Sequence, residues 1–348
     1  MLNRELMVIY LKRFRVFIPE PEWPESHKVL EDVAEVVVGE PGVKYSEDLL
    51  ASILKEFDAV IITSQHRISR RVIYECPRLK VIGKYGSKPG PDNVDLVAAT
   101  ERGIPVVYSP EANSDSVAEH TVALILCLLK RICFLDHLLK QGVWRDEFLA
   151  KKDLNRELKD KTVGIIGLGA IGKRVARILQ SFGTRLIGYD PYISPEALAE
   201  INITLVKNLD ELLRESDIVT IHASLTPETF HMIGERELRL MKPTAFIINT
   251  ARGALIDEIA LVKALKEKWI AGAALDVFEK EPPPKDHLLL QLSNVIVTPH
   301  FASCTYEAFE KETVTVHKDV VRVLMGCKPI YIANPEVLSK RPDLRDCQ

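Results

Sequence analysis

In the first 110 residues, the spacing of hydrophobic positions alternates between the period of a β-strand and that of an α-helix. Short apolar runs rich in β-branched residues predict strands at residues 14–18, 35–39, 59–63, 80–85 and 105–109. The segments between them have the spacing of amphipathic helices, with Ser46 and Ser69 at expected N-caps and Gly103 at an expected helix end. Strand and helix signals that alternate in this way predict a parallel sheet covered by helices on both faces.

A second series of the same kind follows a long helical stretch. Residues 113–140 predict one helix, closed by Gly142, and residues 305–325 predict another near the end of the chain. Further strands are predicted at residues 162–169, 185–190, 217–223, 244–250, 270–278 and 294–300, the last opening as a buried core strand. The predicted fold class is therefore α/β, with two doubly wound parallel-sheet lobes and ligands at the carboxyl ends of the strands, in a cleft between the lobes.

Composition narrows the functional classes. The chain has 348 residues, 47% of them apolar and 27% charged, which favours two globular domains. A net charge of -3 gives no reason to expect a nucleic-acid or membrane partner. The amino-terminal segment lacks the pattern of a signal peptide, and the longest apolar run, residues 122–129, is too short to span a bilayer. We therefore expect a cytoplasmic protein.

The cysteines show neither a CxxC motif nor the regular spacing of a disulfide framework. This pattern predicts reduced thiols in an intracellular protein. The cysteines concerned are Cys76, Cys127, Cys133, Cys304, Cys327 and Cys347.

A glycine-rich motif lies between the strand at 162–169 and the helix after it. Gly167 permits a tight turn, Gly169 lets the backbone approach a pyrophosphate, and Gly172 lets the helix pack close to the strand. Free N–H groups at the helix start can then bind phosphates. Asp190 follows 18 residues after Gly172, where a carboxylate bonds a ribose 2′-hydroxyl and repels a 2′-phosphate. The motif predicts NAD rather than NADP; a glycine turn that serves packing alone is the alternative.

Three other predicted strand ends carry reactive side chains. Arg252 follows one strand, Glu281 follows the strand that ends near Asp276, and His300 comes directly after Pro299. The planar guanidinium of arginine suits a bidentate bond to a carboxylate. A carboxylate bonded to one imidazole nitrogen fixes the tautomer and makes the other nitrogen more basic. These groups together predict oxidation of a hydroxy acid with NAD.

Each of these residues also has a structural explanation. Arg252 could form a surface ion pair, Glu281 could be a loop charge, and His300 could be a core histidine with both ring nitrogens bonded. Their occurrence together at strand ends of a dinucleotide fold favours catalysis. We expect no metal site, because His300 has only Cys304 at ligand spacing and the other histidines form no zinc pattern.

The sequence resembles the D-isomer-specific 2-hydroxyacid dehydrogenases over nearly its whole length. The resemblance rests on SVAEHTVALIL (116–126), GIIGLGAIGKRVA (164–176), HASLTPETFHMIG (222–234), NTARGALIDE (249–258), GAALDVFEKEP (272–282) and TPHFAS (298–303). It implies a flavodoxin-like substrate domain at residues 1–112, to which a helix and tail at 305–348 return. It also implies a Rossmann NAD-binding domain at 113–304 and a homodimer formed largely through the NAD-binding domains.

The resemblance also implies roles for individual residues. Arg252 corresponds to the arginine that binds the substrate carboxylate, His300 to the acid/base, and Glu281 to its partner. Substrate contacts are implied for the loop after the fourth strand, at Tyr85, Gly86 and Ser87. NAD contacts are implied at Gly167, Gly169, Ala170, Ile171, Gly172, Asp190, His222, Ala223, Thr229, Thr250, Ala251, Asp276 and Ala302.

Within the family, the pattern looks most like 3-phosphoglycerate dehydrogenases and glyoxylate or hydroxypyruvate reductases. Some phosphoglycerate enzymes hold the phosphate with arginines after the third strand, where this chain has Thr63 and Gln65; Arg67 and Lys88 are nearby cations. The short segment after NPEVL is expected to leave no room for a serine-sensing regulatory domain, and Glu281 argues against the formate dehydrogenase branch. The loop after the third strand does not favour a phosphorylated substrate, which stays an alternative. The alternative function is an NAD-sensing, corepressor-like binding protein with little turnover.

Overall fold

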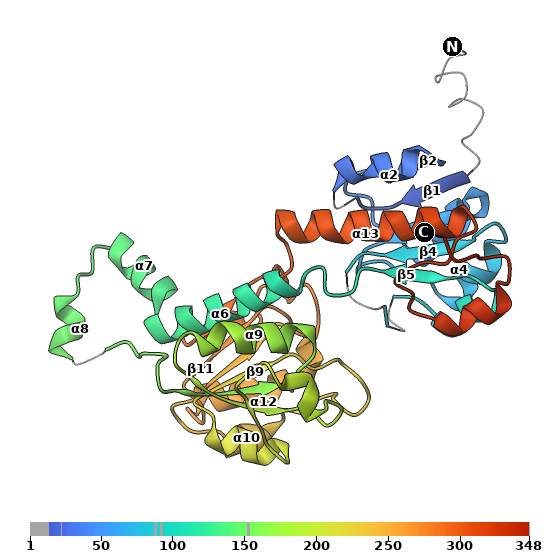
Figure 1. The fold of residues 1–348 in the computed structure, drawn as a ribbon. Helices are drawn as coiled ribbons and strands as arrows, with labels where there is room; N and C mark the ends of the chain where they lie inside the picture. The colour runs from blue at the N-terminus through green and yellow to red at the C-terminus, as the bar shows by residue number, and fades with distance from the viewer. Residues whose placement is uncertain (1–13, 22, 87–88, 91–92, 152–153, 348) are drawn as a thin grey trace, which may run out of the picture. The chain divides into compact units, whose positions relative to one another are not determined.

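The computed structural model describes residues 14–21, 23–86, 89–90, 93–151 and 154–347 (Figure 1). Ser87 and Lys88 lie outside the described residues. So do residues 1–13, which make up most of the amino-terminal segment that lacks the pattern of a signal peptide. The chain separates into two compact units, each with its own parallel sheet. Unit 1 comprises Met1–Asn113 with Cys304–Gln348, and unit 2 comprises Ser114–Ser303.

Unit 1 contains five parallel strands in the order β2-β1-β3-β4-β5. This order is that of flavodoxin-like doubly wound sheets and agrees with the predicted fold class. Every strand predicted in this half of the chain is present. The strands are β1 (Phe14–Ile18), β2 (Ala34–Val38), β3 (Ala59–Ile62), β4 (Val81–Lys84) and β5 (Val106–Tyr108).

Helices cover both faces of this sheet. One core lies under α3 (Glu47–Ile53), α4 (Arg70–Glu75) and α5 (Leu96–Glu101), and the other under α2 (Lys28–Glu31) and α13 (Tyr306–Leu324). Helix α13 packs directly on β4, where a Cβ at Gly83 would lie only 2.8 Å from Val316 Cγ1. The hydroxyl of Ser46 caps α3 by accepting from Leu49 N, as predicted, whereas Ser69 occupies the N-cap of α4 without such a bond. Short 3-10 helices are η1 (Pro24–His27), η2 (Leu54–Glu56) and η6 (Pro335–Lys340).

Unit 2 contains seven parallel strands in the order β12-β11-β10-β9-β6-β7-β8. Counted from β6, this is the Rossmann order extended by one strand. The two-residue strand β8 was not predicted, because so short an element has no periodic pattern. The strands are β6 (Thr162–Ile166), β7 (Arg185–Tyr189), β8 (Thr204–Leu205), β9 (Ile218–Ile221), β10 (Phe246–Asn249), β11 (Gly272–Leu275) and β12 (Val295–Val297).

The helices of unit 2 also cover both faces of its sheet. One core includes residues of α6 (Ser114–Lys130) and α9 (Ala170–Gln180), and the other includes residues of α10 (Leu209–Glu215), α11 (Glu235–Leu240) and α12 (Glu258–Lys266). Two further helices, α7 (Ile132–Lys140) and α8 (Asp146–Ala150), have no buried residue. Short 3-10 helices are η3 (Pro195–Leu198), η4 (Gly253–Leu255) and η5 (Leu288–Gln291).

The prediction of one continuous helix over residues 113–140 was wrong. Arg131 has a φ of 53°, in the left-handed region, and separates α6 from α7. Its guanidinium lies 4.7 Å from the ring centroid of Phe134 and 5.7 Å from that of Phe148, and so joins α7 to α8. Arginine carries no signal for a helix break, because the break depends on contacts with residues further along the chain.

The prediction of a buried core strand at the end of unit 2 was also wrong. β12 is the edge strand of its sheet and pairs with β11. Val295 and Ile296 are half-buried, and Val297 is 37% exposed. Apolar β-branched residues are equally compatible with an edge strand and a central strand, so their sequence could not decide between the two.

Two cysteines that were expected to be reduced form a disulfide. Cys327 and Cys347 are linked with a Cα–Cα distance of 5.6 Å. Backbone bonds from Lys328 N to Arg345 O and from Arg345 N to Gly326 O bring the two segments together after α13. A separation of 20 residues resembles no framework spacing, so the pair was not apparent in the sequence. The four other cysteines are free. No helix in the described ranges is both long enough and apolar enough to cross a membrane.

Candidate active site

The glycine motif of unit 2 forms a tight turn between β6 and α9. Gly167 has a φ of 86°, and a Cβ there would lie 2.7 Å from the backbone of His222 and Ala223. A Cβ at Gly172 would lie 2.1 Å from Gly167 O, so α9 packs against the turn itself. A Cβ at Gly169 would meet no atom within 4 Å. The three positions therefore have the geometry of a turn, a close helix contact and an open approach to the backbone.

Helix α9 begins at Ala170, so the N–H groups of its first turn, including that of Ile171, are available for an anion. Asp190, at the end of β7, accepts from Leu168 N at 2.9 Å through Oδ2 and from Tyr192 N at 2.9 Å through Oδ1. The carboxylate is thereby held against the glycine turn. Each oxygen keeps a second lone pair for a ligand hydroxyl.

His222 follows β9 beside the same turn. Its Nε2 lies 2.9 Å from Thr220 Oγ1, while its Nδ1 is buried without a hydrogen-bond partner among the described residues. Burial lowers the pKa of His222 to about 3, so the ring is neutral at physiological pH. An orphaned buried nitrogen is a costly feature that a polar group of a bound ligand would relieve. The turn, the helix start, Asp190 and His222 thus fit a dinucleotide.

Two threonines predicted to contact NAD have hydrogen-bond partners in unit 2. Thr229 Oγ1 donates to Ser224 O at 2.7 Å within its own loop. Thr250 is buried, and its hydroxyl lies 2.9 Å from that of Thr121 on α6. Both hydroxyls therefore help to hold the loops that follow β9 and β10.

The strand end after β10 carries the predicted carboxylate-binding residue. Arg252 is exposed, and its Nη1 donates to Ala251 O at 2.7 Å. Asn249 shapes this turn by accepting from Ala251 N at 3.0 Å and donating to Arg252 O at 2.8 Å. Sequence analysis did not single out Asn249, because an asparagine at a strand end is common in turns.

Glu281 and His300 meet across two loops. His300 Nδ1 lies 2.7 Å from Glu281 Oε2, and Phe278 N donates to Glu281 Oε1 at 3.0 Å. Burial alone would raise the pKa of Glu281, but the bonds from His300 and Phe278 and the charges of His300 and Arg252 lower it below its ordinary value. The structure therefore brings all three predicted catalytic residues together in unit 2.

The loop that carries His300 is anchored by Asp276. His300 has a φ of 54°, and its backbone N–H donates to Asp276 O at 2.8 Å. The Asp276 carboxylate, 1% exposed, accepts from Phe301 N at 2.8 Å and Ala302 N at 2.9 Å. It also accepts from Thr298 Oγ1, which lies 3.1 Å from Nε2 of His120 on α6. Asp276, predicted to contact NAD, is thus the support of this loop.

The described part of the predicted substrate loop belongs to unit 1. Tyr85 is 2% exposed, and its hydroxyl lies 2.8 Å from His317 Nε2 in the core under α13. The N–H groups of Tyr85 and Gly86 donate to Ile62 O and Ser109 Oγ. The substrate contacts at Tyr85, Gly86 and Ser87 stay predictions.

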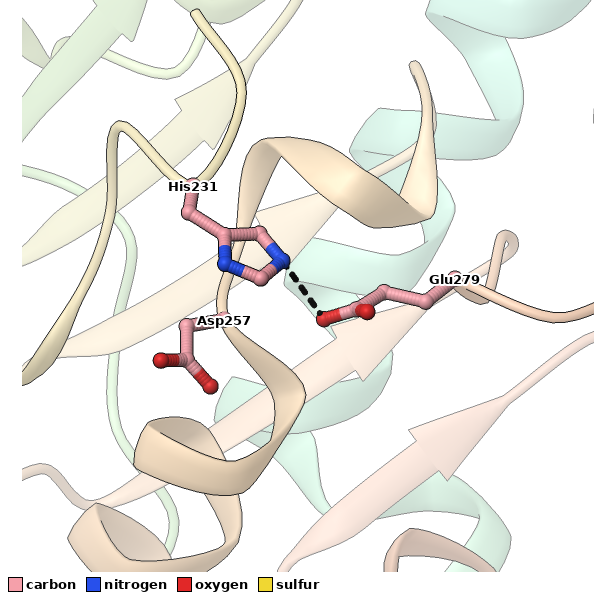
Figure 2. Close-up of side chains that lie close together, drawn as sticks. All are labelled: His231, Asp257 and Glu279. Carbon is pink, nitrogen blue, oxygen red and sulfur yellow. Dashed lines mark ion pairs between the residues drawn. The ribbon is translucent and has the colours of Figure 1, made fainter.

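One group in unit 2 combines side chains that could in principle bind a metal. His231, Asp257 and Glu279 have ligand atoms within 4.8 Å of one another (Figure 2). Asp257 caps α12 by accepting from Ala260 N at 3.0 Å. Glu279 Oε1 accepts from Glu258 N at 3.0 Å and lies 3.0 Å from His231 Nε2, a close contact without hydrogen-bond alignment. These bonds explain the group as structural, and we assign it no metal.

Comparison with known proteins identifies the family. Residues 122–302 match the model of the D-isomer specific 2-hydroxyacid dehydrogenase NAD binding domain. The chain is 42% identical over 336 residues to a glyoxylate reductase from Thermofilum pendens, covering 96% of each protein. This chain is a D-2-hydroxyacid dehydrogenase. It is also 44% identical over 312 residues to a D-3-phosphoglycerate dehydrogenase from Methanocaldococcus jannaschii, covering 90% of this chain but 58% of that protein.

Solved structures of the family have the same fold. The TT0316 protein from Thermus thermophilus superposes with a TM-score of 0.84 at 33% identity, covering 91% of this chain and 99% of that one. A glyoxylate/hydroxypyruvate reductase from Sinorhizobium meliloti, solved with NADP and malonate, has a TM-score of 0.80 at 25% identity, covering 93% of this chain and 98% of that one. The family, the fold class and the NAD-dependent oxidoreductase activity predicted from the sequence are confirmed. The preference for NAD over NADP stays a prediction. The relatives' enzymatic names favour this activity over the sensor alternative.

Proposed function

We propose that this dehydrogenase interconverts a small, unphosphorylated 2-oxo acid such as glyoxylate or hydroxypyruvate with its D-2-hydroxy acid. The observation that carries the proposal is the bonded His300–Glu281 pair beside Arg252, on the unit that holds the dinucleotide turn. The name of the Thermofilum pendens relative, which this chain matches along 96% of its length, supports glyoxylate as a substrate.

The proposed reduction uses the three side chains in separate roles. Arg252 binds the substrate carboxylate with its guanidinium and so orients C2. Bound NADH supplies the hydride. His300 gives a proton from Nε2 to the carbonyl oxygen, while its Nδ1–H stays bonded to Glu281 Oε2 at 2.7 Å. Glu281 fixes the ring orientation and stabilises the protonated imidazole before transfer. In oxidation, His300 takes the hydroxyl proton.

Unit 2 is proposed to be the NAD-binding domain, and unit 1 the substrate-binding domain. The N–H groups around Gly169, Ala170 and Ile171 would hold the pyrophosphate, and Asp190 the adenosine ribose. His222 Nδ1, which is buried and unpartnered among the described residues, would bond a polar group of the dinucleotide. Five further predicted contacts lie in the loops after β9, β10 and β12: Ala223, Thr229, Thr250, Ala251 and Ala302.

The region after β3 supports an unphosphorylated substrate. Thr63 is buried, and its hydroxyl lies 3.1 Å from His66 Nδ1. Arg67 is exposed and pairs with Glu47 at 3.4 Å. A phosphate would have to compete with that carboxylate for the guanidinium.

The test is NADH oxidation with glyoxylate, hydroxypyruvate, pyruvate and 3-phosphohydroxypyruvate, each repeated with NADPH. We expect faster turnover on glyoxylate or hydroxypyruvate than on the phosphorylated acid, and a preference for NADH because Asp190 repels a 2′-phosphate. A higher kcat/KM for 3-phosphohydroxypyruvate would overturn the substrate proposal while leaving the reaction class unchanged.

We also propose that the enzyme is a homodimer formed through unit 2. Helices α7 and α8 extend away from the sheet of unit 2 and have no buried residues (Figure 1). Large apolar side chains are exposed on these helices and on the loop between them, with Leu139 at 55%, Trp144 at 59% and Leu149 at 54%. So much exposed apolar surface is typical of an interface. Light scattering should give twice the chain mass, and Leu139→Glu should lower it.

A cytoplasmic location is proposed as well. The four free cysteines support a reducing compartment. The disulfide between Cys327 and Cys347 is compatible with it, because intracellular proteins of hyperthermophilic archaea and bacteria contain such bonds. Fractionation of the native cells tests this location.

A further inference from the structure

The segment Phe278–Glu279 lies between two catalytic residues. Phe278 N–H donates to Glu281 at 3.0 Å, which sets the position of the carboxylate that bonds His300. On its other side, the peptide group that follows Phe278 packs on the turn of Arg252. A Cβ at Gly253 would lie 1.9 Å from Phe278 C and 2.3 Å from Glu279 N. Any shift of this peptide would therefore move Glu281, Arg252 or both.

Glu258 holds the same segment from outside the site. It is the first residue of α12, and its side chain is 14% exposed. Glu279 N donates to Glu258 Oε1 at 2.7 Å, and Glu258 N donates in return to Glu279 Oε1 at 3.0 Å. Consecutive backbone N–H groups of one segment thus bind Glu281 and Glu258.

His287 orients the Glu258 carboxylate. Its Nδ1 accepts from Leu289 N at 3.3 Å, so its proton is on Nε2, which donates to Glu258 Oε2 at 3.0 Å. The His287 ring packs edge-on against Phe278, with a centroid distance of 5.8 Å. Both carboxylate oxygens of Glu258 therefore accept hydrogen bonds from the loop that carries Glu281.

An acidic residue at this place has a simpler explanation, namely stabilisation of the N-terminus of α12. That role needs no particular partner, and Asp257 already caps the helix through Ala260 N. The Glu258 side chain instead forms its bonds away from its own helix, with Glu279 and His287.

We propose that Glu258 is a positioning residue for catalysis, which acts by fixing the Phe278–Glu279 segment between Glu281 and the Arg252 turn. The inference rests on the proposed roles of these two residues. Glu258 does not touch the substrate, so its loss should impair the chemical step and the binding of the carboxylate while leaving NADH affinity unchanged.

The experiment compares Glu258→Ala and Glu258→Gln with Glu267→Ala, a change at an exposed glutamate on the C-cap of the same helix. Glu258→Ala should lower kcat/KM for glyoxylate about tenfold or more, since small misplacements of reacting groups are costly, with the NADH dissociation constant changed by less than about twofold. Glu258→Gln should keep more activity, because its amide oxygen still accepts from Glu279 N. Its NH₂ would face the His287 Nε2–H donor, so the rescue should be partial. Glu267→Ala should match the unchanged enzyme.

A readout independent of turnover is the downfield proton NMR signal of the His300 Nδ1–H, identified by its absence in His300→Ala. We expect this signal to shift or broaden in Glu258→Ala and to be nearer normal in Glu258→Gln. Normal kcat/KM and an unchanged signal in Glu258→Ala, with only a lower Tm, would reduce Glu258 to a helix-terminus acid and overturn the inference. If Glu258→Ala fails to fold, Glu258→Gln with the same two readouts decides. Absence of turnover in the unchanged enzyme would count against the proposed function instead, and the NMR signal would still test Glu258.

Discussion

Two histidines of this chain have the same tautomer and different environments. His300 donates from Nδ1 to the carboxylate of Glu281 at 2.7 Å, and His317 donates from Nδ1 to the carbonyl of Ser26 at 3.1 Å. The His300 side chain is 41% exposed, whereas His317 is completely buried and accepts a bond from Tyr85 at Nε2. The partner's charge and the access of water therefore distinguish a ring that can exchange a proton from one that holds a core together.

The largest expected effect comes from removing the exposed ring. His300→Ala should lower kcat for glyoxylate by about 10³-fold, because the proton donor to the carbonyl is lost. Fluorescence titration should give an unchanged NADH dissociation constant, since the dinucleotide turn is not altered. Near-normal turnover would show that His300 is as structural as His317.

Replacing the buried ring of His317 should change the free energy of unfolding rather than the catalytic rate. Burial lowers the pKa of His317 to about 4. The hydrogen bond to Ser26 raises this pKa, and the charge of His27 lowers it further. The pKa of this histidine in the unfolded chain is about 6.5. At pH values between the two pKa values, the unfolded chain binds a proton at His317 that the folded protein does not bind, so the free energy of unfolding falls as the pH drops. The contribution of His317 is about 3 kcal/mol over this range.

Urea unfolding of the wild-type protein and of His317→Gln at a series of pH values measures this contribution. The variant should be less stable at neutral pH and should depend less on pH below 6.5, the ordinary pKa of histidine. His27, whose pKa is also lowered by burial, is coupled to His317 through its charge, so the same measurement on His27→Gln, with and without His317→Gln, is the control. Parallel curves for the two proteins would contradict the assignment.

Changing the partner of the exposed ring should have an intermediate effect. Glu281→Gln keeps an acceptor for His300 Nδ1–H but loses its charge, so kcat/KM should fall about 10- to 30-fold, equivalent to about 1.4–2 kcal/mol. Because the pKa of Glu281 is lowered in the folded protein, its pairing with His300 is present above the ordinary carboxyl range and is lost only as pH falls through the lowered value. In the acid range, the activity of the Gln variant relative to wild type should therefore rise.

The smallest expected effect comes from the partner of the buried ring. Tyr85→Phe removes the hydroxyl that donates to His317 and should cost about 1 kcal/mol of unfolding free energy. KM for glyoxylate should change by less than about twofold, because this side chain lies in the core of unit 1. A large rise in KM would instead support a direct substrate contact for the Tyr85 side chain.

Much of the fold and the centre of the site could be predicted from local pattern. Alternating strand and helix signals predict parallel sheets, and the carboxyl ends of parallel strands meet at one edge. That rule is sufficient to bring Arg252, Glu281 and His300 together although they are separated in sequence. The predictions were wrong where the local sequence pattern gave no signal or fitted two structures. These places are the Arg131 break, the edge strand β12 and the Cys327–Cys347 disulfide.

The supporting roles of residues around the site also escaped sequence analysis. Asn249 shapes the Arg252 turn, and Asp276, which the sequence predicted only as an NAD contact, holds the His300 loop. Glu258, 21 residues away from Glu279 in the chain, holds the segment next to Glu281. An asparagine, an aspartate or a glutamate carries no sign in the sequence of which backbone N–H group it will bond.

The sequence by itself determined the α/β class and the dinucleotide turn and predicted which side chains react, because these follow from periodicity, glycine spacing and the chemistry of residue types. Only the tertiary structure decided which histidine faces a carboxylate and which faces a carbonyl in the core. That difference depends on desolvation and on partners distant in the chain, such as Glu281, 19 residues before His300, and Ser26, 291 residues before His317. Such contacts arise only when the elements pack.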